Sequence, residues 1–302
     1  MGRIKVIANP VAGRGLCGKL VPELHEQLAA QALDYDLICS TEPGHAVALA
    51  EQALAEGYET IVAVGGDGTA HEVVNGMLTY SGGDEVGTMA TIPVGSGSDF
   101  ANLLGMPAQL DQACARLARG RTRWVDVGVV TDSQGRSTYF DNTVGIGFDG
   151  VVTQEARGVK YLRGMALYLP VVLKTVFLTM KPPRVVIRYN DQRLEQVALM
   201  ITVCIGQREG GGFIIAPDAK NDDGLFDVCV ADNCPKLQIL GMIPHFMKGT
   251  HVDKKPVTMF RTDHLTVTSE DDLIAHMDGE MLCTEEHRLE FKILPRRLQV
   301  IY

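Results

Sequence analysis

Short apolar runs alternate with amphipathic stretches over the first 125 or so residues, and this alternation constrains the fold more than any other feature. The apolar runs are predicted strands, at Arg3–Asn9, Tyr35–Cys39, Thr60–Val64 and Thr88–Pro93. The amphipathic stretches are predicted helices, at Leu16–Gln31, His45–Glu56, Ala70–Leu78 and Gln109–Arg119. Because TIVAV at Thr60–Val64 is apolar on both faces, helices must cover both sides of the sheet. The alternation therefore predicts a parallel sheet between two helical layers.

The pattern changes near Trp124–Val130. The segments that follow are rich in β-branched residues and are separated by Gly, Asp and Asn, as is typical of an antiparallel domain. These predicted strands are Thr138–Val144, Arg184–Tyr189, Glu195–Ile205, Leu225–Val230, His264–Thr268 and Leu289–Leu294. A chain of 302 residues is also long enough for two domains of ~100–200 residues each.

Charge and cysteine usage exclude several classes of protein. The net charge is −9, from 28 basic and 37 acidic residues, so we expect no general nucleic-acid binding. Seven scattered cysteines without a CxxC pair predict reduced thiols in the cytoplasm, with neither a disulfide framework nor a structural zinc site. The sequence shows no secretory signal and no uncharged apolar run of 18 residues, so we expect no membrane-spanning helix.

A basic stretch stands out against this acidic background. Arg157–Arg193 holds eight cations and one acid, a local charge of +7. It contains the apolar segment Tyr161–Met180, which is interrupted by two cations and a central proline. Two interpretations remain open: a helix pair that faces lipid, and a buried helix whose charged ends reach solvent.

The segment GGDGTAHE, Gly65–Glu72, directly follows the predicted strand TIVAV and opens a helix. Glycines let backbone N–H groups approach phosphate oxygens, and the helix N-terminus favours an anion. Thr69 suits a helix cap or a phosphate contact. Asp67 would repel phosphate, so it fits a role in holding Mg²⁺ or an acceptor hydroxyl. The structural alternative is a tight strand–helix turn with Asp at a capping position.

The segment TIPVGSGSDF, Thr91–Phe100, has the same arrangement after the next strand of the sheet. Ser96 lies between two glycines, and Asp99 opens the following helix. Both loops should emerge at the carboxyl edge of the sheet, where open α/β sheets bind ligands. Alone, Asp99 is a helix cap; paired with Asp67 it is a candidate site residue.

Two familiar patterns are discounted. Gly13–Leu20 resembles a Walker A loop but has Leu20 in place of the Mg²⁺-binding hydroxyl. Gly145–Gly150 matches G-x-G-x-x-G, yet no acid occurs from Ala156 to Asn190 to hold a ribose. We interpret both as ordinary loop glycines.

The second domain contributes two acidic loops. The turn Asn221–Gly224 suits a hard cation or is a plain turn rich in Asn and Asp. Asp278 and Glu280 lie on a tight turn within His276–Met281; Glu280 is a candidate general base, and a simple hairpin turn is the alternative.

The motifs NPVAG, GGDGT, IPVGSGSDF, DVG, GFD, IAPDAKNDDGLFDV and DGE occur in this order along nearly the whole chain. The chain thereby resembles the diacylglycerol kinase catalytic-domain family, most closely the soluble bacterial lipid kinases related to sphingosine and ceramide kinases. The GGDGT motif alone is shared with NAD kinases and 6-phosphofructokinases. The resemblance implies a NAD kinase/diacylglycerol kinase-like fold of two domains. These are a three-layer α/β ATP-binding domain at 1–127 and a β-sandwich lipid- and metal-binding domain at 128–289, with about 290–302 returning to the first.

The resemblance also implies site residues. ATP contacts would come from Thr41, Gly65, Gly66, Asp67, Gly68, Thr69, Ala70, His71 and Ser96. A water-bridged Mg²⁺ network would involve Asp67, Asp99 and Asp126, and Glu280 would accept the proton. A separate structural metal would bind Asp223 and backbone oxygens of Lys220 and Leu225. Tyr161–Met180 would be the lipid-facing insertion.

The chain departs from the family pattern at three positions. Ser96 and Ser98 replace the usual Thr and Asn, and His71 stands where Asn is common. Ser96 keeps the hydroxyl, whereas Ser98 lacks the amide.

We therefore expect an ATP- and Mg²⁺-dependent lipid kinase that phosphorylates diacylglycerol or a similar lipid at the membrane surface, with a homodimer left open. One alternative is a NAD kinase-type enzyme with a soluble acceptor. The other is a non-catalytic regulator that binds nucleotide or lipid.

Overall fold

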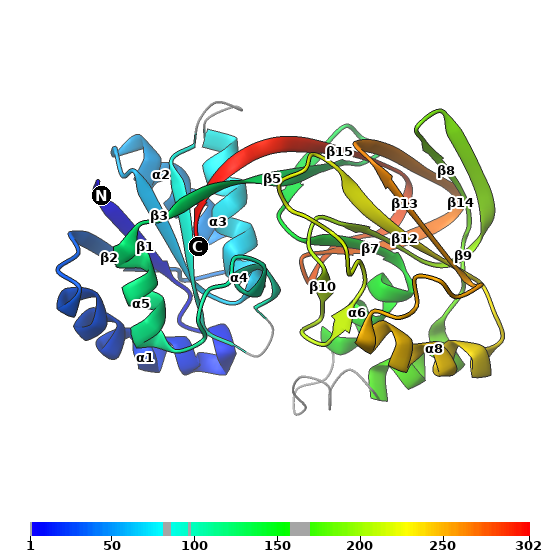
Figure 1. The fold of residues 1–302 in the computed structure, drawn as a ribbon, viewed down its shortest axis with the longest axis horizontal. Coiled ribbons are helices and arrows are strands. Elements are labelled where there is room, and N and C mark those ends of the chain that lie inside the picture. The colour runs from blue at the N-terminus through cyan, green and yellow to red at the C-terminus, as the bar shows by residue number, and fades with distance from the viewer. Residues whose placement is uncertain (1, 81–85, 96–97, 158–169) are drawn as a thin grey trace. The chain divides into compact units, whose positions relative to one another are not determined.

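The computed structural model describes residues 2–80, 86–95, 98–157 and 170–302, and the chain forms two compact units (Figure 1). The first unit comprises Met1–Asp126 together with Arg296–Tyr302, and the second comprises Val127–Pro295. The assignment of ATP binding to one unit and of lipid and metal binding to the other stays a prediction.

The first unit is built on a parallel sheet in the order β15-β4-β3-β1-β2. Its strands are β1 (Ile4–Ala8), β2 (Tyr35–Cys39), β3 (Thr60–Gly65), β4 (Thr88–Pro93) and the end of β15 (Glu280–Ile301). Every residue of β3 is buried, because helices cover both faces of this central strand. The predicted parallel sheet between two helical layers is confirmed.

Helices α1 and α5 pack together, as do α2 and α3. The helices of this unit are α1 (Ala12–Ala30), α2 (His45–Ala55), α3 (Asp67–Tyr80), α4 (Asp99–Leu103) and α5 (Leu110–Arg119). Within α1, three consecutive residues at 13–15 have positive φ angles of 59°, 59° and 82°. Regular helix therefore begins at Leu16, as the sequence predicts.

The second unit is a mainly antiparallel β-sandwich. Its strands are β5 (Thr122–Thr131), β6 (Ser137–Phe140), β7 (Thr143–Gly147), β8 (Arg184–Tyr189), β9 (Gln192–Cys204), β10 (Arg208–Glu209), β11 (Phe213–Ile214), β12 (Phe226–Asp232), β13 (Val257–Thr262), β14 (His264–Met277) and most of β15. The main strand order is β13-β12-β9-β7-β14-β15, and β8 also pairs with both β9 and β14. Phe140 anchors the core, stacked on Phe226 and edge-on to Phe291.

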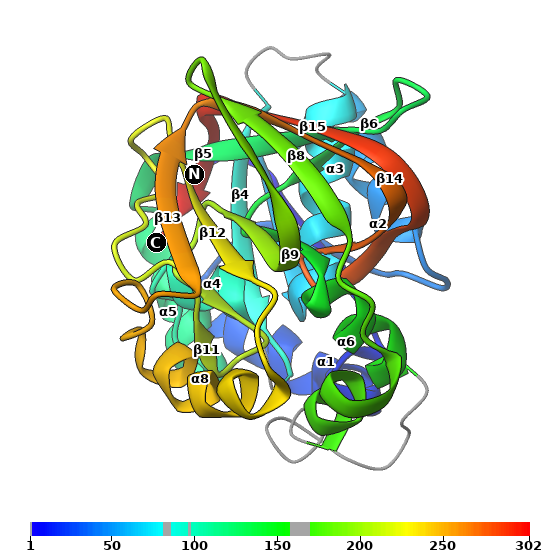
Figure 2. The same cartoon turned by 90° about the vertical axis from the view of Figure 1, so that its right-hand side faces the viewer.

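Helices cover one side of the second unit, as Figure 2 shows for α6 and α8. They are α6 (Phe148–Arg157), the π-helical turn η1 (Thr175–Thr179) and α8 (Lys236–Lys248). Buried Val152, Val176 and Ile239 from these elements pack in a second core cluster against Cys229 of β12. Sequence patterning did not predict α6 or α8, because their apolar faces are short and Pro244 interrupts α8.

Three predicted boundaries differ from the structure. The predicted strand Thr138–Val144 is two strands, β6 and β7, with Asp141 and Asn142 between them. The predicted strand Leu289–Leu294 is the middle of a 22-residue strand, β15. The helix predicted to begin at Ala70 begins at Asp67, so the GGDGT residues 67–69 form its first turn.

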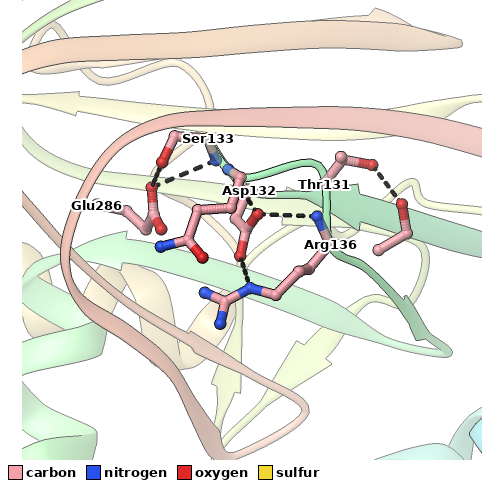
Figure 3. A network of polar contacts seen from close by, with 7 residues as sticks. Thr131, Asp132, Ser133, Arg136 and Glu286 are labelled. Carbon is pink, nitrogen blue, oxygen red and sulfur yellow. Dashed lines mark hydrogen bonds and ion pairs between the residues drawn. The ribbon is translucent and has the colours of Figure 1, made fainter.

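The hairpin that joins β5 to β6 is held by its own acidic side chain (Figure 3). Asp132 accepts hydrogen bonds from the backbone N–H groups of Gln134 and Arg136, at 2.9 Å each, and from Arg136 Nε at 2.6 Å. Burial raises the pKa of Asp132, but these hydrogen bonds outweigh it and hold the pKa below its ordinary value. Ser133 Oγ donates to Glu286 of β15 at 2.6 Å, which ties the hairpin to that strand.

Candidate functional site

The loop after β3 packs too tightly for a side chain at its first glycine. A Cβ on Gly65 would lie 2.3 Å from Thr69 Oγ1. The N–H groups of Thr69 and Ala70 donate to Gly66 O at 3.0 and 3.2 Å, which starts α3 directly behind the loop. A Cβ on Gly66 would meet nothing within 4 Å. The predicted glycine-rich turn thus places the N-terminus of a 14-residue helix at the carboxyl end of a buried strand.

Asp67 and Asp99 come together at this edge. Asp67 Oδ1 accepts a hydrogen bond from the N–H of Phe100 at 3.1 Å, so its carboxylate lies at the first turn of α4. Asp99 begins that helix and is only 6% exposed. The Asp67 carboxylate therefore reaches the strand–helix junction that carries Asp99.

The N-terminal NPVAG segment reaches the same loop. Asn9 Nδ2 donates to Thr69 Oγ1 at 3.1 Å, and Asn9 Oδ1 accepts from Val11 N at 3.2 Å. Beyond it, a Cβ on Gly13 would lie 3.6 Å from Val94, just before the second glycine loop. Loops from three strands thus adjoin at one edge of the sheet.

Thr41 follows β2 and contacts His45 in the first turn of α2. Thr41 Oγ1 and the Thr41 N–H both lie within hydrogen-bond distance of His45 Nδ1, at 2.9 and 3.1 Å. The N-terminus of α2 is capped from α3, where Glu72 accepts from Gly44 N and Ala46 N. This contact fixes the Thr41 loop beside the helix that carries GGDGT.

The other residues that were predicted to contact ATP lie in different surroundings. Gly68 lies in the first turn of α3. His71 Nε2 is 3.3 Å from Asn75 Nδ2, and the same amide donates to the His71 carbonyl. Ser96 lies outside the described residues.

Asp126 is buried in β5 and has a visible structural role. Its Oδ1 accepts a hydrogen bond from the N–H of Arg296 at 2.7 Å, and the residue is 1% exposed. Arg296 has a positive φ of 49°. Asp126 therefore stabilises the bend where the chain re-enters the first unit.

In the second unit, Glu280 follows a two-residue turn between β14 and β15. Met277 pairs with Glu280, and the intervening Asp278 and Gly279 have φ angles of 49° and 83°, as in a type I′ hairpin. The buried Asp278 carboxylate accepts hydrogen bonds from three consecutive N–H groups, at 141–143. Glu280 itself is exposed. The structure thus positions Glu280 rigidly by means of its neighbour.

The acidic turn at Asp223 is already neutralised within this unit. Asp223 Oδ1 accepts from Leu225 N at 3.2 Å, and Oδ2 forms an ion pair with Arg261. Arg261 Nε also lies 3.4 Å from Asp227. Lys220 is exposed beside this turn. A cation bound at Asp223 would have to displace the guanidinium, so this conformation does not fit a metal ion there.

The pair at the first-unit edge does fit Mg²⁺. Asp67 and Asp99 offer carboxylate oxygens only, the donors that Mg²⁺ prefers, and Asp99 Oδ1 is buried at the start of a helix.

The second unit also contains a cluster of three polar side chains that the sequence did not predict. Asp149, Glu209 and His276 each offer one ligand atom, and these atoms lie within 4.8 Å of one another. Burial, then the Glu209 carboxylate, raises the pKa of Asp149 to about 7. Burial lowers the pKa of His276, but the adjacent Glu209 outweighs it and the net pKa is raised. The three residues lie in distant segments of the chain, so no spacing pattern joins them.

Two family models match the chain. The diacylglycerol kinase catalytic domain matches residues 3–130. The YegS C-terminal NAD kinase beta sandwich-like domain matches residues 142–302.

Curated relatives and solved structures agree with these matches. A diacylglycerol kinase of Mycobacterium tuberculosis is 28% identical over all of this chain and 95% of its own length. One from Bacillus subtilis is 26% identical over 93% of this chain and 90% of its own length. The crystal structure of a diacylglycerol kinase from Bacillus anthracis superposes with a TM-score of 0.76 at 22% identity, covering 100% of this chain and 96% of that one.

Proposed function

The chain belongs to the diacylglycerol kinase catalytic-domain family, and from this premise we propose that it transfers the γ-phosphoryl group of ATP to a hydroxyl group of a lipid such as diacylglycerol. The observation that carries the proposal is the contact of Asp67, in the Gly65–Thr69 turn, with the first turn of α4, which Asp99 begins. Relatives of similar length are named diacylglycerol kinase, which supports the acceptor class.

The residues of the first unit would bind the nucleotide. Backbone N–H groups at the start of α3 favour the phosphate oxygens, because the helix N-terminus carries partial positive charge. Thr69 is held by Asn9 at 3.1 Å, which fixes its hydroxyl at the turn. Asp67 and Asp99 would hold Mg²⁺, which when bound offsets the charge on the phosphates.

In the transfer step, the oxygen of the lipid hydroxyl forms a bond to the γ-phosphorus and the bond from that phosphorus to the leaving ADP oxygen breaks. The hydroxyl proton passes to a carboxylate. We assign this role to Glu280, whose exposed side chain follows the rigid Asp278–Gly279 turn. The Asp67 carboxylate is the alternative acceptor.

The decisive experiment follows labelled γ-phosphate from ATP and Mg²⁺ to lipids in mixed micelles, beside NAD and sugar phosphates in buffer. We expect label in the organic phase. Label only in NAD would place the chain with the NAD kinases, and nucleotide binding without transfer to any acceptor would indicate a regulator.

Asp67→Asn tests the site in the same assay. The amide oxygen can still accept the hydrogen bond from Phe100, so the fold should persist, while turnover should fall about 100-fold or more. Asp111→Asn, on the first turn of α5, is the matched control and should leave turnover unchanged. Equal turnover of Asp67→Asn and wild type would contradict the assignment.

We further propose that the second unit meets the lipid surface through an apolar patch formed by Phe177, Leu178 and Leu237. Leu178 and Leu237 are 78% and 81% exposed. Lys236 joins the two elements, because its Nζ donates to Phe177 O at 2.9 Å. Exposed apolar side chains beside lysines suit an anionic bilayer surface.

This patch includes the end of the basic apolar stretch singled out in the sequence. Residues 158–169 of that stretch lie outside the described residues. Within the described part of the chain, no helix is both long enough and apolar enough to cross a bilayer. We therefore propose reversible association with the membrane surface as the mode of access to the lipid.

A further inference from the structure

Gly145 lets two polar side chains approach each other over the β-sheet of the second unit. In the central strand β7, Gly145 pairs with Thr202 of β9 on one side and with His276 of β14 on the other. A Cβ at this position would lie 2.4 Å from His276 Nε2 and 2.6 Å from Asp149 Cβ. The missing side chain therefore lets the His276 imidazole and the Asp149 side chain approach each other above β7.

The chain directs three potential ligands into this space. Asp149 comes from the first turn of α6, and Glu209 comes from β10. Thr202 Oγ1 donates to Asp149 Oδ2 at 2.7 Å, which orients the carboxylate. His276 Nε2 lies 2.6 Å from Glu209 Oε1. All three ligand atoms fall within 4.8 Å of one another.

Polar atoms of this cluster lack hydrogen bonds within the described part of the chain. They are Nδ1 of His276, a residue that is 1% exposed, and Oε2 of Glu209; His276 Nε2 already faces Glu209 Oε1. Buried polar atoms are nearly always satisfied. The Glu209 side chain is 17% exposed, so a small solute can reach the cluster from solvent.

We propose that Asp149, Glu209 and His276 bind one divalent transition-metal ion of the zinc class. A bound ion would displace the proton of the His276 imidazole. The neutral ring and the two carboxylates then carry a charge of −2, which a divalent ion balances. A nitrogen donor favours zinc, cobalt or nickel over magnesium and calcium, which prefer oxygen ligands. Tetrahedral metal–ligand bonds of ~2.0–2.2 Å set neighbouring ligand atoms about 3.4 Å apart. The His276–Glu209 pair, at 2.6 Å, would open by less than about 1 Å, and ligand atoms as far as 4.8 Å apart would close by about 1.4 Å.

This site is separate from the predicted catalytic residues and contains no cysteine, which is why cysteine spacing gave no signal. It joins α6, β10 and β14, and His276 lies two residues before Asp278. An ion that binds the native state only would raise the stability of the second unit by linkage.

The test is titration of the full chain, first stripped with a chelator, with zinc in the presence of millimolar Mg²⁺. Millimolar Mg²⁺ occupies sites that consist of oxygen ligands alone, so zinc that still binds indicates a site with a nitrogen ligand. We expect one equivalent of zinc per chain and a rise of several degrees in the unfolding midpoint at free zinc about 100 times the dissociation constant. Cobalt should give visible d–d absorption with the same stoichiometry.

The variants test whether zinc binds to these three residues or to other histidines and acids. Asp149→Asn and Glu209→Gln preserve shape and remove charge, and each should weaken zinc binding at least 10-fold, as should His276→Asn. His264→Gln is the matched control, because His264 lies 2.6 Å from Asp263 on the exposed surface. His264→Gln and Asp223→Asn should both bind zinc as wild type does.

Two results would overturn the proposal: no zinc bound by wild type at tens of micromolar free metal, or unchanged binding in folded Asp149→Asn and Glu209→Gln. Circular dichroism establishes that each variant is folded. Because the readout is metal binding, the result does not depend on the proposed kinase activity.

Discussion

Gly65 and Gly66 adjoin in the chain but meet different surroundings. The Cβ position of Gly65 is filled by Thr69, whereas that of Gly66 faces open space. The sequence motif predicts glycine at both positions for phosphate approach. The structure adds that Gly65 is also required by packing, since the helix turn folds back on it.

This difference can be measured with paired variants. Gly65→Ala should lower the free energy of unfolding by about 1–3 kcal/mol, because its methyl group overlaps the Thr69 side chain. Gly66→Ala should change it by less than about 0.5 kcal/mol. Urea denaturation without nucleotide gives both values. Equal effects of the two variants would refute the packing argument.

Asp67 shows how a candidate site residue can also be structural. As an acid that directly follows a strand, it is predicted to hold Mg²⁺ or an acceptor hydroxyl. In the structure its carboxylate accepts a hydrogen bond from the N–H of Phe100. Sequence spacing could not show this contact, because 33 residues separate the two partners.

At the scale of elements, two hairpin turns of the second unit have the same type of backbone conformation but different hydrogen-bond partners. Asp278–Gly279 and Asn190–Asp191 both have two positive φ angles. The Asp278 carboxylate accepts three hydrogen bonds from backbone N–H groups at 141–143. Asp191 is exposed. The Asp278 carboxylate therefore supports the gap between β6 and β7, whereas the second turn contacts β13 through Asn190 and leaves the Asp191 side chain exposed.

Asp278→Ala should reduce the free energy of unfolding by about 3 kcal/mol or more, because it leaves buried N–H groups without an acceptor. Asp191→Ala should cost only about 1 kcal/mol, since both variants place alanine at positive φ. Thermal and urea unfolding test the difference. Similar losses in the two variants would mean that the three hydrogen bonds contribute nothing beyond backbone strain.

The same turn explains a wrong boundary. The sequence pattern predicts Thr138–Val144 as one β-rich segment, yet the strand is interrupted at Asp141 and Asn142. The acceptor that stabilises this interruption is Asp278, more than 130 residues away. Local patterning carries no information about such a partner.

At the scale of the whole molecule, β15 belongs to both units. Its residues up to Pro295 lie in the second unit, and those from Arg296 onward complete the sheet of the first. Val300 pairs with Met89 of β4 in parallel, and Thr88 Oγ1 donates to Gln299 at 2.7 Å. The first unit is therefore built from two separate segments of sequence, whereas the second unit is one continuous segment.

The proposed membrane association depends on the whole molecule, because the net charge of −9 opposes binding to anionic lipid except through one face. The protein should sediment with anionic vesicles, less so at high salt because ions screen the attraction. Leu178→Asp with Leu237→Asp should abolish sedimentation, since both side chains are exposed on the apolar patch.

Leu16→Asp, an exposed leucine of the first unit, is the matched control and should sediment as wild type does. Full vesicle binding by the double variant would show that the patch formed by Phe177, Leu178 and Leu237 is not the docking surface.

The sequence alone determined the alternating strands and helices of the first unit, the antiparallel character of the second, and the acids that follow β3 and β4. These features rest on local periodicity and on strand–helix junctions, which depend on neighbours within a few residues. The tertiary structure decided which acids have partners: Asp67 with Phe100, Asp126 with Arg296, Asp223 with Arg261, and the group of Asp149, Glu209 and His276. Hydrogen bonds and ion pairs form between groups that folding brings within about 3 Å, and the distance between those groups along the chain does not reveal which will meet.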